Sequence, residues 1–343
     1  MRDLLCTVGP DRGRPTLSIP KFYRAFLIAR KADGFSEKTL QKYETALRDL
    51  EEFASLNNFP SDLLDLQPFH IRAWLTNLRD RSYKSHPNKP PSSKLLSPNT
   101  QWTYWMVIRA FYKWACKEGY IKKNPCENIK GPKQQETVIR PLDQAHIEAL
   151  LRLCPPNTWW GARDRALIIM LLTTGMRRGE IAGIRLGDIE LENNRIKVSG
   201  KGDRRFQRKE RYVAILPQLI GPLINWLRFR EKIVRENRLE TDALWLGLVS
   251  SKNCWLPLSS NAIGCILRRL KERVGIKEVR LSAHTFRHTF ALNFARARMV
   301  KRNLQEILGH RDPRSTEAYT RYVDHELALQ EQRELNPFKS WKL

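Results

Sequence analysis

The chain has 343 residues, of which 41% are hydrophobic, and this is enough for about two domains that each bury a core. Its 61 Lys and Arg against 36 Asp and Glu leave a formal net charge of +25, which predicts a polyanionic partner, nucleic acid rather than an anionic membrane surface. No apolar run approaches the roughly 18 residues of a membrane span and no secretory leader is recognisable, so we expect a cytoplasmic, nucleoid-associated protein.

The first part of the chain is expected to be helical. Residues 1–15 carry glycines and prolines among charges and are expected to form a flexible segment. Over residues 16–123 apolar side chains such as Leu47 and Leu50 recur at steps of three and four, the period of an amphipathic helix. Ser36 is a candidate helix start. We predict one domain with four main helices.

A stretch rich in proline and serine, residues 81–98, separates the third and fourth of these helices and excludes a regular element there. Its lysines, Lys84, Lys89 and Lys94, are expected to be exposed. Two interpretations stay open: a disordered surface loop, or an arm that orders when it contacts DNA. Protection of these lysines from acylation by added DNA would support the arm.

A second stretch interrupted by prolines and a glycine, residues 124–140, is the expected linker between the domains. The second domain is expected at 141–333, and a tail follows at 334–343. Alternating patterns in the second domain predict short strands over residues 188–191, 195–199 and 211–216. Helical patterns cover residues 162–172, 178–184, 217–237, 259–274, 284–299, 301–309 and 315–333. The predicted fold class is mainly α, with one small antiparallel β-sheet in the second domain.

The cysteines give no sign of a metal site. No two of them form a C-x-x-C pair, which argues against a zinc ribbon and against a redox motif. We therefore expect reduced thiols, no metal and no cofactor. The six residues are Cys6, Cys116, Cys126, Cys154, Cys254 and Cys265.

Two groups of polar residues in the second domain could bind an anion. Arg177 lies where one helix is expected to stop at a glycine and another to begin, with Glu180 three residues later to orient it. His284 and Arg287 are three residues apart on a predicted helix and share a face, with His288 near them. Taken singly, each group is better explained as a surface salt bridge or a capping pair, and a zinc site lacks a third ligand.

Four motifs follow one another over most of residues 140–325. They are Leu-Leu-Thr-Thr-Gly-Met-Arg-Arg-Gly-Glu-Ile, Val-Ser-Gly-Lys-Gly, Ser-Ala-His-Thr-Phe-Arg-His-Thr-Phe-Ala, and Leu-Gly-His with a tyrosine nine residues later. In this order they resemble the tyrosine recombinase family of phage integrases and Xer-type site-specific recombinases. The helices of the first domain resemble, by pattern alone, the SAM-like core-binding domain of that family.

The resemblance implies a nucleophile and a clamp for phosphate. Tyr319 would attack the scissile phosphate to give a 3′-phosphotyrosine and a free 5′-hydroxyl, so that the strands could rejoin without ATP. Arg177 and Arg287 would bind the non-bridging oxygens through planar, bidentate donors. Tyr322 is a second candidate nucleophile, but the spacing from the Leu-Gly-His motif favours Tyr319.

The resemblance also implies residues that move protons. His284 and His310 would hydrogen-bond the same phosphate or shuttle the tyrosine proton, and Lys201 would protonate the leaving 5′-oxygen. Glu180 would support Arg177 without contacting the phosphate itself. The hairpin after Lys201 is several residues longer than the usual family pattern, so Lys209 stays open as the acid.

Finally, the resemblance implies a two-domain clamp around double-stranded DNA at an inverted-repeat core site, and a homotetramer that joins two duplexes. An accessory factor, and the choice among integration of a mobile element, excision, resolution and inversion, stay open. The tail at 334–343 would either pass to a neighbouring protomer or pack on its own domain. The alternatives are a regulator of the same fold that does not cleave DNA, and relaxation of supercoils as in type IB topoisomerases.

Overall fold

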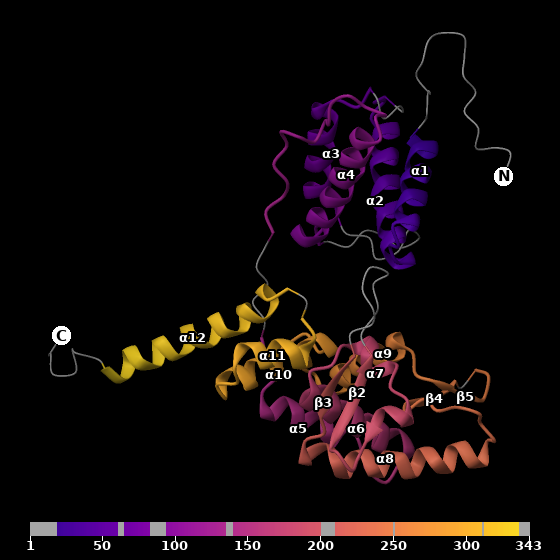
Figure 1. The fold of residues 1–343 in the computed structure, drawn as a ribbon, viewed down its shortest axis with the longest axis vertical. Coiled ribbons are helices and arrows are strands. Elements are labelled where there is room, and N and C mark those ends of the chain that lie inside the picture. Colours follow the sequence, from indigo (N-terminus) through magenta and orange to yellow (C-terminus); the bar gives the residue numbers. More distant parts are fainter. Residues whose placement is uncertain are drawn as a thin grey trace. The chain divides into compact units, whose positions relative to one another are not determined.

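The computed structural model describes residues 19–60, 65–82, 94–134, 140–199, 210–249, 251–310 and 312–335. The chain divides into two compact units, with the division near residue 137. Figure 1 follows the chain from the indigo helices of the first unit to the orange and yellow helices of the second. Among the described helices, none is both long and apolar enough to cross a membrane.

The first unit contains the four predicted helices. They are α1 (Ile19–Ala32), α2 (Glu37–Leu56), α3 (Pro68–Asp80) and α4 (Pro98–Lys117). The Ser36 hydroxyl accepts a hydrogen bond from the backbone N–H of Thr39, which confirms the predicted helix start. Ser97 caps α4 in the same way, and proline follows it at a position where the helix needs no N–H donor.

Aromatic side chains fill the core of the first unit. Phe26 is fully buried and meets Phe111 edge to face, with ring centroids 5.3 Å apart. The indole N–H of buried Trp74 donates to Asp49 at 2.9 Å, and Arg81 pairs with the same carboxylate at 2.6 Å. Because Asp49 accepts from both side chains, the ring of Trp74 can be buried without leaving its N–H donor unpaired.

The two ends of the loop predicted at 81–98 lie side by side. The backbone N–H of Leu96 donates to the carbonyl of Arg81 at 3.0 Å, next to an isolated antiparallel bridge. Residues 83–93 lie outside the described residues, with two of the three lysines of the predicted arm. The loop and arm interpretations therefore stay predictions.

The second unit is mainly helical around α6 (Trp159–Thr174). Residues 166–171 of α6 are buried without a break, as in a helix that is covered on all sides, and α6 packs on α8 and α10. It ends at Gly175, whose φ of 60° is left-handed, at the predicted stop. The other helices are α5 (Gln144–Arg152), α7 (Arg178–Ala182), α8 (Pro217–Glu236), α9 (Ser260–Val274), α10 (Ala283–Arg296), α11 (Lys301–Leu308) and α12 (Arg314–Leu335).

Two small antiparallel sheets accompany these helices, where the sequence predicted one. The predicted sheet has the strand order β1 (Ile189–Glu190), β2 (Arg195–Ser199), β3 (Glu210–Ala214). Ile196 of β2 pairs with Val213 of β3, and both side chains are buried. A hairpin of β4 (Leu246–Val249) and β5 (Cys254–Pro257) was missed. Each of its strands has four residues, too few for alternation to be distinguished from an irregular apolar run. The predicted fold class is confirmed, and the prediction of a single sheet is wrong.

Candidate active site

Segments from three neighbouring helices meet at α10. This helix packs against α6, α11 and α12. Arg177 follows α6, His284 and Arg287 lie on α10, His310 follows α11, and Tyr319 lies on α12. The structure brings these five predicted residues into one cluster, because packing against a single helix places the ends of its neighbours together.

Arg177 caps the N-terminus of α7 and is held there by Glu180. Its backbone N–H donates to one carboxylate oxygen at 2.8 Å, and its Nη1 donates to the other at 3.0 Å. Its Nη2 donates to the carbonyl of Gly309 at 3.0 Å. The Arg177 side chain is nevertheless 47% exposed, whereas that of Glu180 is buried. The guanidinium is therefore oriented on its inner side and open to an anion on its outer side.

Arg287 is buried, and its hydrogen-bond acceptors among the described residues are backbone carbonyls. Nη1 donates to Gly175 at 2.8 Å, and Nη2 donates to Leu308 at 2.7 Å. Both carbonyls lie at helix C-termini, where the helix dipole favours a cation. Burial, followed by the charge of Arg177, lowers the pKa of Arg287 to about 10. No carboxylate in the described parts of the chain pairs with Arg287, so the two arginines together create a positively charged site that an anion would stabilise.

Tyr319 is 4% exposed and lies between two histidines. Its Oη is 2.5 Å from Nδ1 of His288, and its ring lies nearly parallel to that of His310, with centroids 6.3 Å apart. Burial raises the pKa of Tyr319, and Arg287 opposes that rise. Tyr322, the other candidate, is 40% exposed. Tyr319 is thus the tyrosine inside the cluster.

The histidines of the cluster are neutral near pH 7. Burial, then neighbouring positive charge, lowers the pKa of His288 and of His310 to about 4. Partial burial, then Arg287 and Arg177, also lowers the pKa of His284. Nδ1 of His310 is 2.8 Å from the hydroxyl of Thr316 at the start of α12. Neutral rings can both donate and accept, as proton movement beside a phosphate requires.

Lys201 and Lys209 lie outside the described residues, so their competition for the acid role stays a prediction. The strands on either side of them are described. β2 ends at Ser199 and β3 begins at Glu210.

Arg211, on β3, is a residue of the site that the sequence analysis missed. Its two terminal nitrogens donate to both oxygens of Glu180 at 3.1 and 2.8 Å, and its Nε donates to the carbonyl of Ile307 at 2.7 Å. Burial disfavours the charged form of Glu180, but hydrogen bonds from Arg211 and Arg177 outweigh it and hold the pKa below its usual value. The sequence does contain a signal for this residue: in β3 exposed and buried side chains alternate, and Arg211 occupies a buried position.

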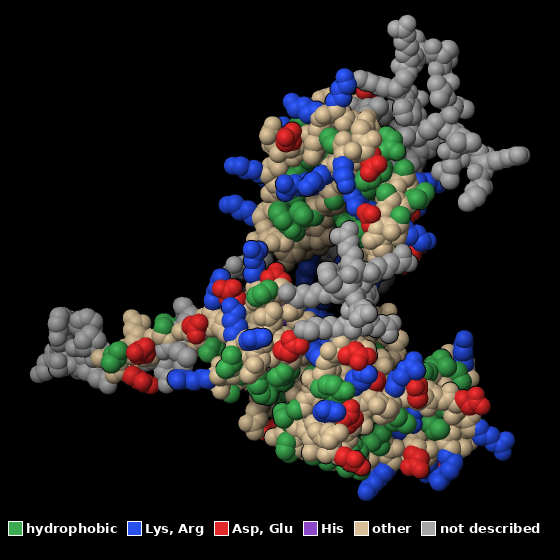
Figure 2. Space-filling model, in the orientation of Figure 1, with side chains coloured by type: hydrophobic (Ala, Val, Ile, Leu, Met, Phe, Trp, Pro, Cys, Tyr) green, Lys and Arg blue, Asp and Glu red, His purple; other side chains and the backbone are tan. Residues whose placement is uncertain are grey.

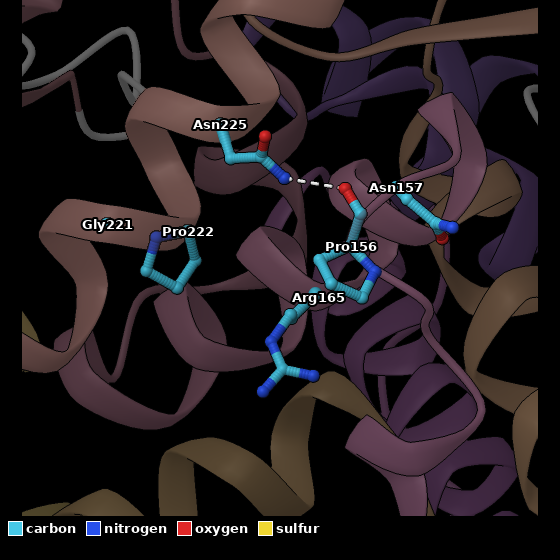
Figure 3. A pocket seen from close by; sticks show the side chains of 6 residues that line it. All are labelled: Pro156, Asn157, Arg165, Gly221, Pro222 and Asn225. Carbon is cyan, nitrogen blue, oxygen red and sulfur yellow. Dashed lines mark hydrogen bonds between the residues drawn. The ribbon is translucent and has the colours of Figure 1, made fainter.

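The surface hollow in Figure 3 is not part of this cluster. It is lined by Pro156, Asn157, Arg165, Gly221, Pro222 and Asn225, none of which is a predicted site residue. The amide of Asn225 donates to the carbonyl of Pro156 across it at 2.8 Å. Elsewhere in the described parts of the chain, no three His, Cys, Asp or Glu side chains are grouped to hold a metal ion.

Comparison with known proteins agrees along most of the chain. A model of the phage integrase family matches residues 140–326, and a model of the phage integrase SAM-like domain matches residues 19–131. The chain is 30% identical to tyrosine recombinase XerC of Oceanobacillus iheyensis, over 90% of this chain and 93% of the relative. It is 28% identical to XerC of Anoxybacillus flavithermus, over 85% and 90%.

A solved structure shares the fold. The post-cleavage complex of the XerH site-specific recombinase with a palindromic difH substrate matches with a TM-score of 0.68. The match has 21% sequence identity and covers 92% of this chain and 84% of that chain.

Proposed function

This chain belongs to the phage integrase family, and on that premise we propose how its own residues carry out the reaction. It is a tyrosine-type site-specific DNA recombinase, which cuts and rejoins DNA strands through a 3′-phosphotyrosine intermediate. The nucleophile is Tyr319. The observation that carries this assignment is its buried hydroxyl beside His288 and Arg287, while Tyr322 is exposed.

The two arginines bind the scissile phosphate. As Oη of Tyr319 bonds to phosphorus, negative charge grows on the non-bridging oxygens and the bond from phosphorus to O5′ breaks. Arg177 presents its open side to one oxygen, and Arg287 donates to the other through N–H groups that do not bind its two carbonyl partners. Donors already in place for the transition state are worth about 3 to 4 kcal/mol each in comparable sites.

Protons move through the histidines and a lysine. Neutral His284 and His310 hydrogen-bond the phosphate or take up the phenolic proton, and Lys201 gives a proton to the leaving O5′. The free 5′-hydroxyl of another strand then attacks the phosphotyrosine and returns Tyr319 to its starting state. No nucleotide is consumed, because the covalent link conserves the bond energy.

The partner is double-stranded DNA with an inverted-repeat core site, as in the palindromic complex of the XerH relative. Lys and Arg side chains lie over the surface of each unit on the face shown in Figure 2, consistent with the net charge of +25. The chain acts as a homo-oligomer, a tetramer in the synapse, on DNA in the cytoplasm. A silent regulator and a topoisomerase are less well supported, because the family models and relatives are recombinases.

Formation of the covalent complex tests the nucleophile. The substrate is a core site nicked just beyond the scissile phosphate, from which the released fragment diffuses away. Wild-type protein is expected to form a complex that survives denaturing electrophoresis, and Tyr319→Phe is expected to form none.

The matched control is Tyr322→Phe, which removes the same atom one turn along α12 and should leave the complex intact. Equal binding of core DNA by both variants would show that only the chemistry differs. A complex retained in Tyr319→Phe and lost in Tyr322→Phe would reverse the assignment.

A further inference from the structure

His288 touches the proposed nucleophile, although neither motif spacing nor the roles above assign it a function. It follows Arg287 directly on α10, and its Nδ1 lies 2.5 Å from Oη of Tyr319. Among the described residues, this is the one hydrogen bond made by that hydroxyl. The contact links α10 to α12 at the reacting atom.

The chemistry of the two groups determines the direction of the hydrogen bond. Burial raises the pKa of Tyr319, so the phenol keeps its proton and needs an acceptor. Burial, then His284 and Arg287, lowers the pKa of His288, so its ring is neutral and has one unprotonated nitrogen. The arrangement that satisfies both groups is donation from Oη to Nδ1.

The surroundings restrict the His288 ring. The ring of His284 meets it edge to face at 4.1 Å between centroids. Nδ1 of His310 is occupied by the hydroxyl of Thr316, so that nitrogen is not the partner of the tyrosine. Of the three histidines in the cluster, His288 is the one in hydrogen-bond contact with Tyr319.

We propose that His288 is a positioning residue for the nucleophile: by accepting the hydrogen bond of the Tyr319 hydroxyl at Nδ1, it holds Oη in one orientation for attack. The proposal rests on the assignment of Tyr319 in the proposed function. Orientation matters because a misplacement of about 1 Å can slow a reaction about 100-fold. This role is fulfilled before the bond to phosphorus forms, and the phenolic proton then leaves Oη for a histidine of the cluster.

Three substitutions at one position test the proposal. His288→Asn places an amide oxygen as many bonds from Cα as Nδ1, so it can accept the same hydrogen bond. His288→Gln places that oxygen one bond further out, and His288→Leu removes the acceptor at similar volume. The measurement is the single-turnover rate of covalent complex formation on the nicked core site, alongside DNA affinity and thermal unfolding.

The leucine variant is expected to bind core DNA as the wild type does and to form the covalent complex about 100-fold more slowly. The asparagine variant should recover most of the rate, and the glutamine variant should recover less. A substrate with a 5′-thiol leaving group, which departs without a proton, should not rescue the leucine variant, because the defect lies on the side of the nucleophile.

A leucine variant that reacts as fast as the wild type, or faster, would overturn the proposal. An asparagine variant that forms the covalent complex no faster than the glutamine variant would also overturn it. This comparison remains decisive even when the leucine variant does not fold. Failure of the proposed function has a different signature, since Tyr319→Phe would then still form the covalent complex whatever occupies position 288.

Discussion

The cationic side chains of the cluster are held by oxygen atoms at helix ends as much as by carboxylates. Arg287 donates to the carbonyls of Gly175 and Leu308, and Arg177 donates to that of Gly309. Carbonyl partners orient a guanidinium without neutralising it, so the positive charge stays available to a phosphate. A carboxylate in their place would compete with the substrate.

The two histidines with strongly lowered pKa values make stability depend on pH. His288 and His310 have a pKa of about 4 in the folded chain, against about 6.5 when unfolded. Between these values the unfolded chain binds more protons, so the free energy of unfolding should fall as pH falls from about 6.5 to about 4. Urea unfolding near pH 7 and near pH 5 measures the change.

The control for this pH effect is the double variant His288→Asn/His310→Asn. It should lose less stability than the wild type between the same two pH values, whatever its stability at neutral pH. An equal loss in both proteins would show that other groups cause the effect.

The choice between Lys201 and Lys209 depends on leaving-group chemistry. Lys201→Ala should cleave an ordinary core site about 100-fold or more slowly, because O5′ then leaves without a proton. A substrate with a 5′-thiol leaving group should restore its rate. Lys209→Ala should match the wild type on both substrates, and rescue confined to Lys209→Ala would transfer the acid role to that residue.

At the scale of elements, β3 and the end of α11 support the site together. Arg211 on β3 binds both oxygens of Glu180 and the carbonyl of Ile307 on α11. Glu180 in turn holds Arg177. The strand that follows the segment carrying Lys201 is thereby tied to the segments that carry an arginine and a histidine of the site.

Gly309 lies close to Arg211 and leaves little room for a side chain. Its φ is +63°, and a Cβ there would lie 2.9 Å from Nη1 of Arg211. Gly309→Ala should cost about 1 to 2 kcal/mol through backbone strain. Displacement of Arg211 should also reduce cleavage strongly. Chemical denaturation and covalent complex formation measure the two effects.

Gly275→Ala, at the end of α9, is the matched control. Its φ is +76°, but nothing lies within 4 Å of the added Cβ. It should lose similar stability and keep its cleavage rate. Equal cleavage defects in the two variants would mean that strain alone, and not the contact with Arg211, is responsible.

At the scale of the whole molecule, the net charge of +25 predicts binding that is highly sensitive to salt. With about 6 to 10 phosphate contacts, affinity for core DNA should fall about 10³-fold or more between roughly 50 and 200 mM salt. Mobility shifts over a KCl series measure the slope, with sucrose at equal osmolality as the control. A flat response would contradict an electrostatic interface.

The end of α12 bears on assembly. Beyond Val323, which is buried, the described residues include Leu329 at 42% and Leu335 at 71% exposure. Two alternatives stay open for the tail that follows, transfer to a neighbouring protomer and packing on its own domain. If the tail is transferred, truncation after Glu331 should weaken cooperative binding to paired sites while leaving binding to a single site unchanged. Unchanged cooperativity would favour packing at home.

Regular elements were predictable because their signals are local. The four helices of the first unit, the helix that stops at Gly175 and the three-stranded sheet follow from apolar spacing, caps and turns. The β4–β5 hairpin was missed because four-residue strands carry too little pattern. The roles implied by resemblance remain proposals, although five of the residues concerned lie in one cluster.

The sequence by itself determined the helical fold class, since periodicity is a property of neighbouring residues. It also determined the order of the motifs, and the resemblance carried by that order implied the kind of chemistry. Only the tertiary structure decided which groups touch. The pairing of Arg211 with Glu180, the carbonyls that hold Arg287, and the contact of His288 with Tyr319 all join residues on different elements. Such contacts depend on how helices pack, and packing places residues side by side that are 21 to 112 positions apart in the chain.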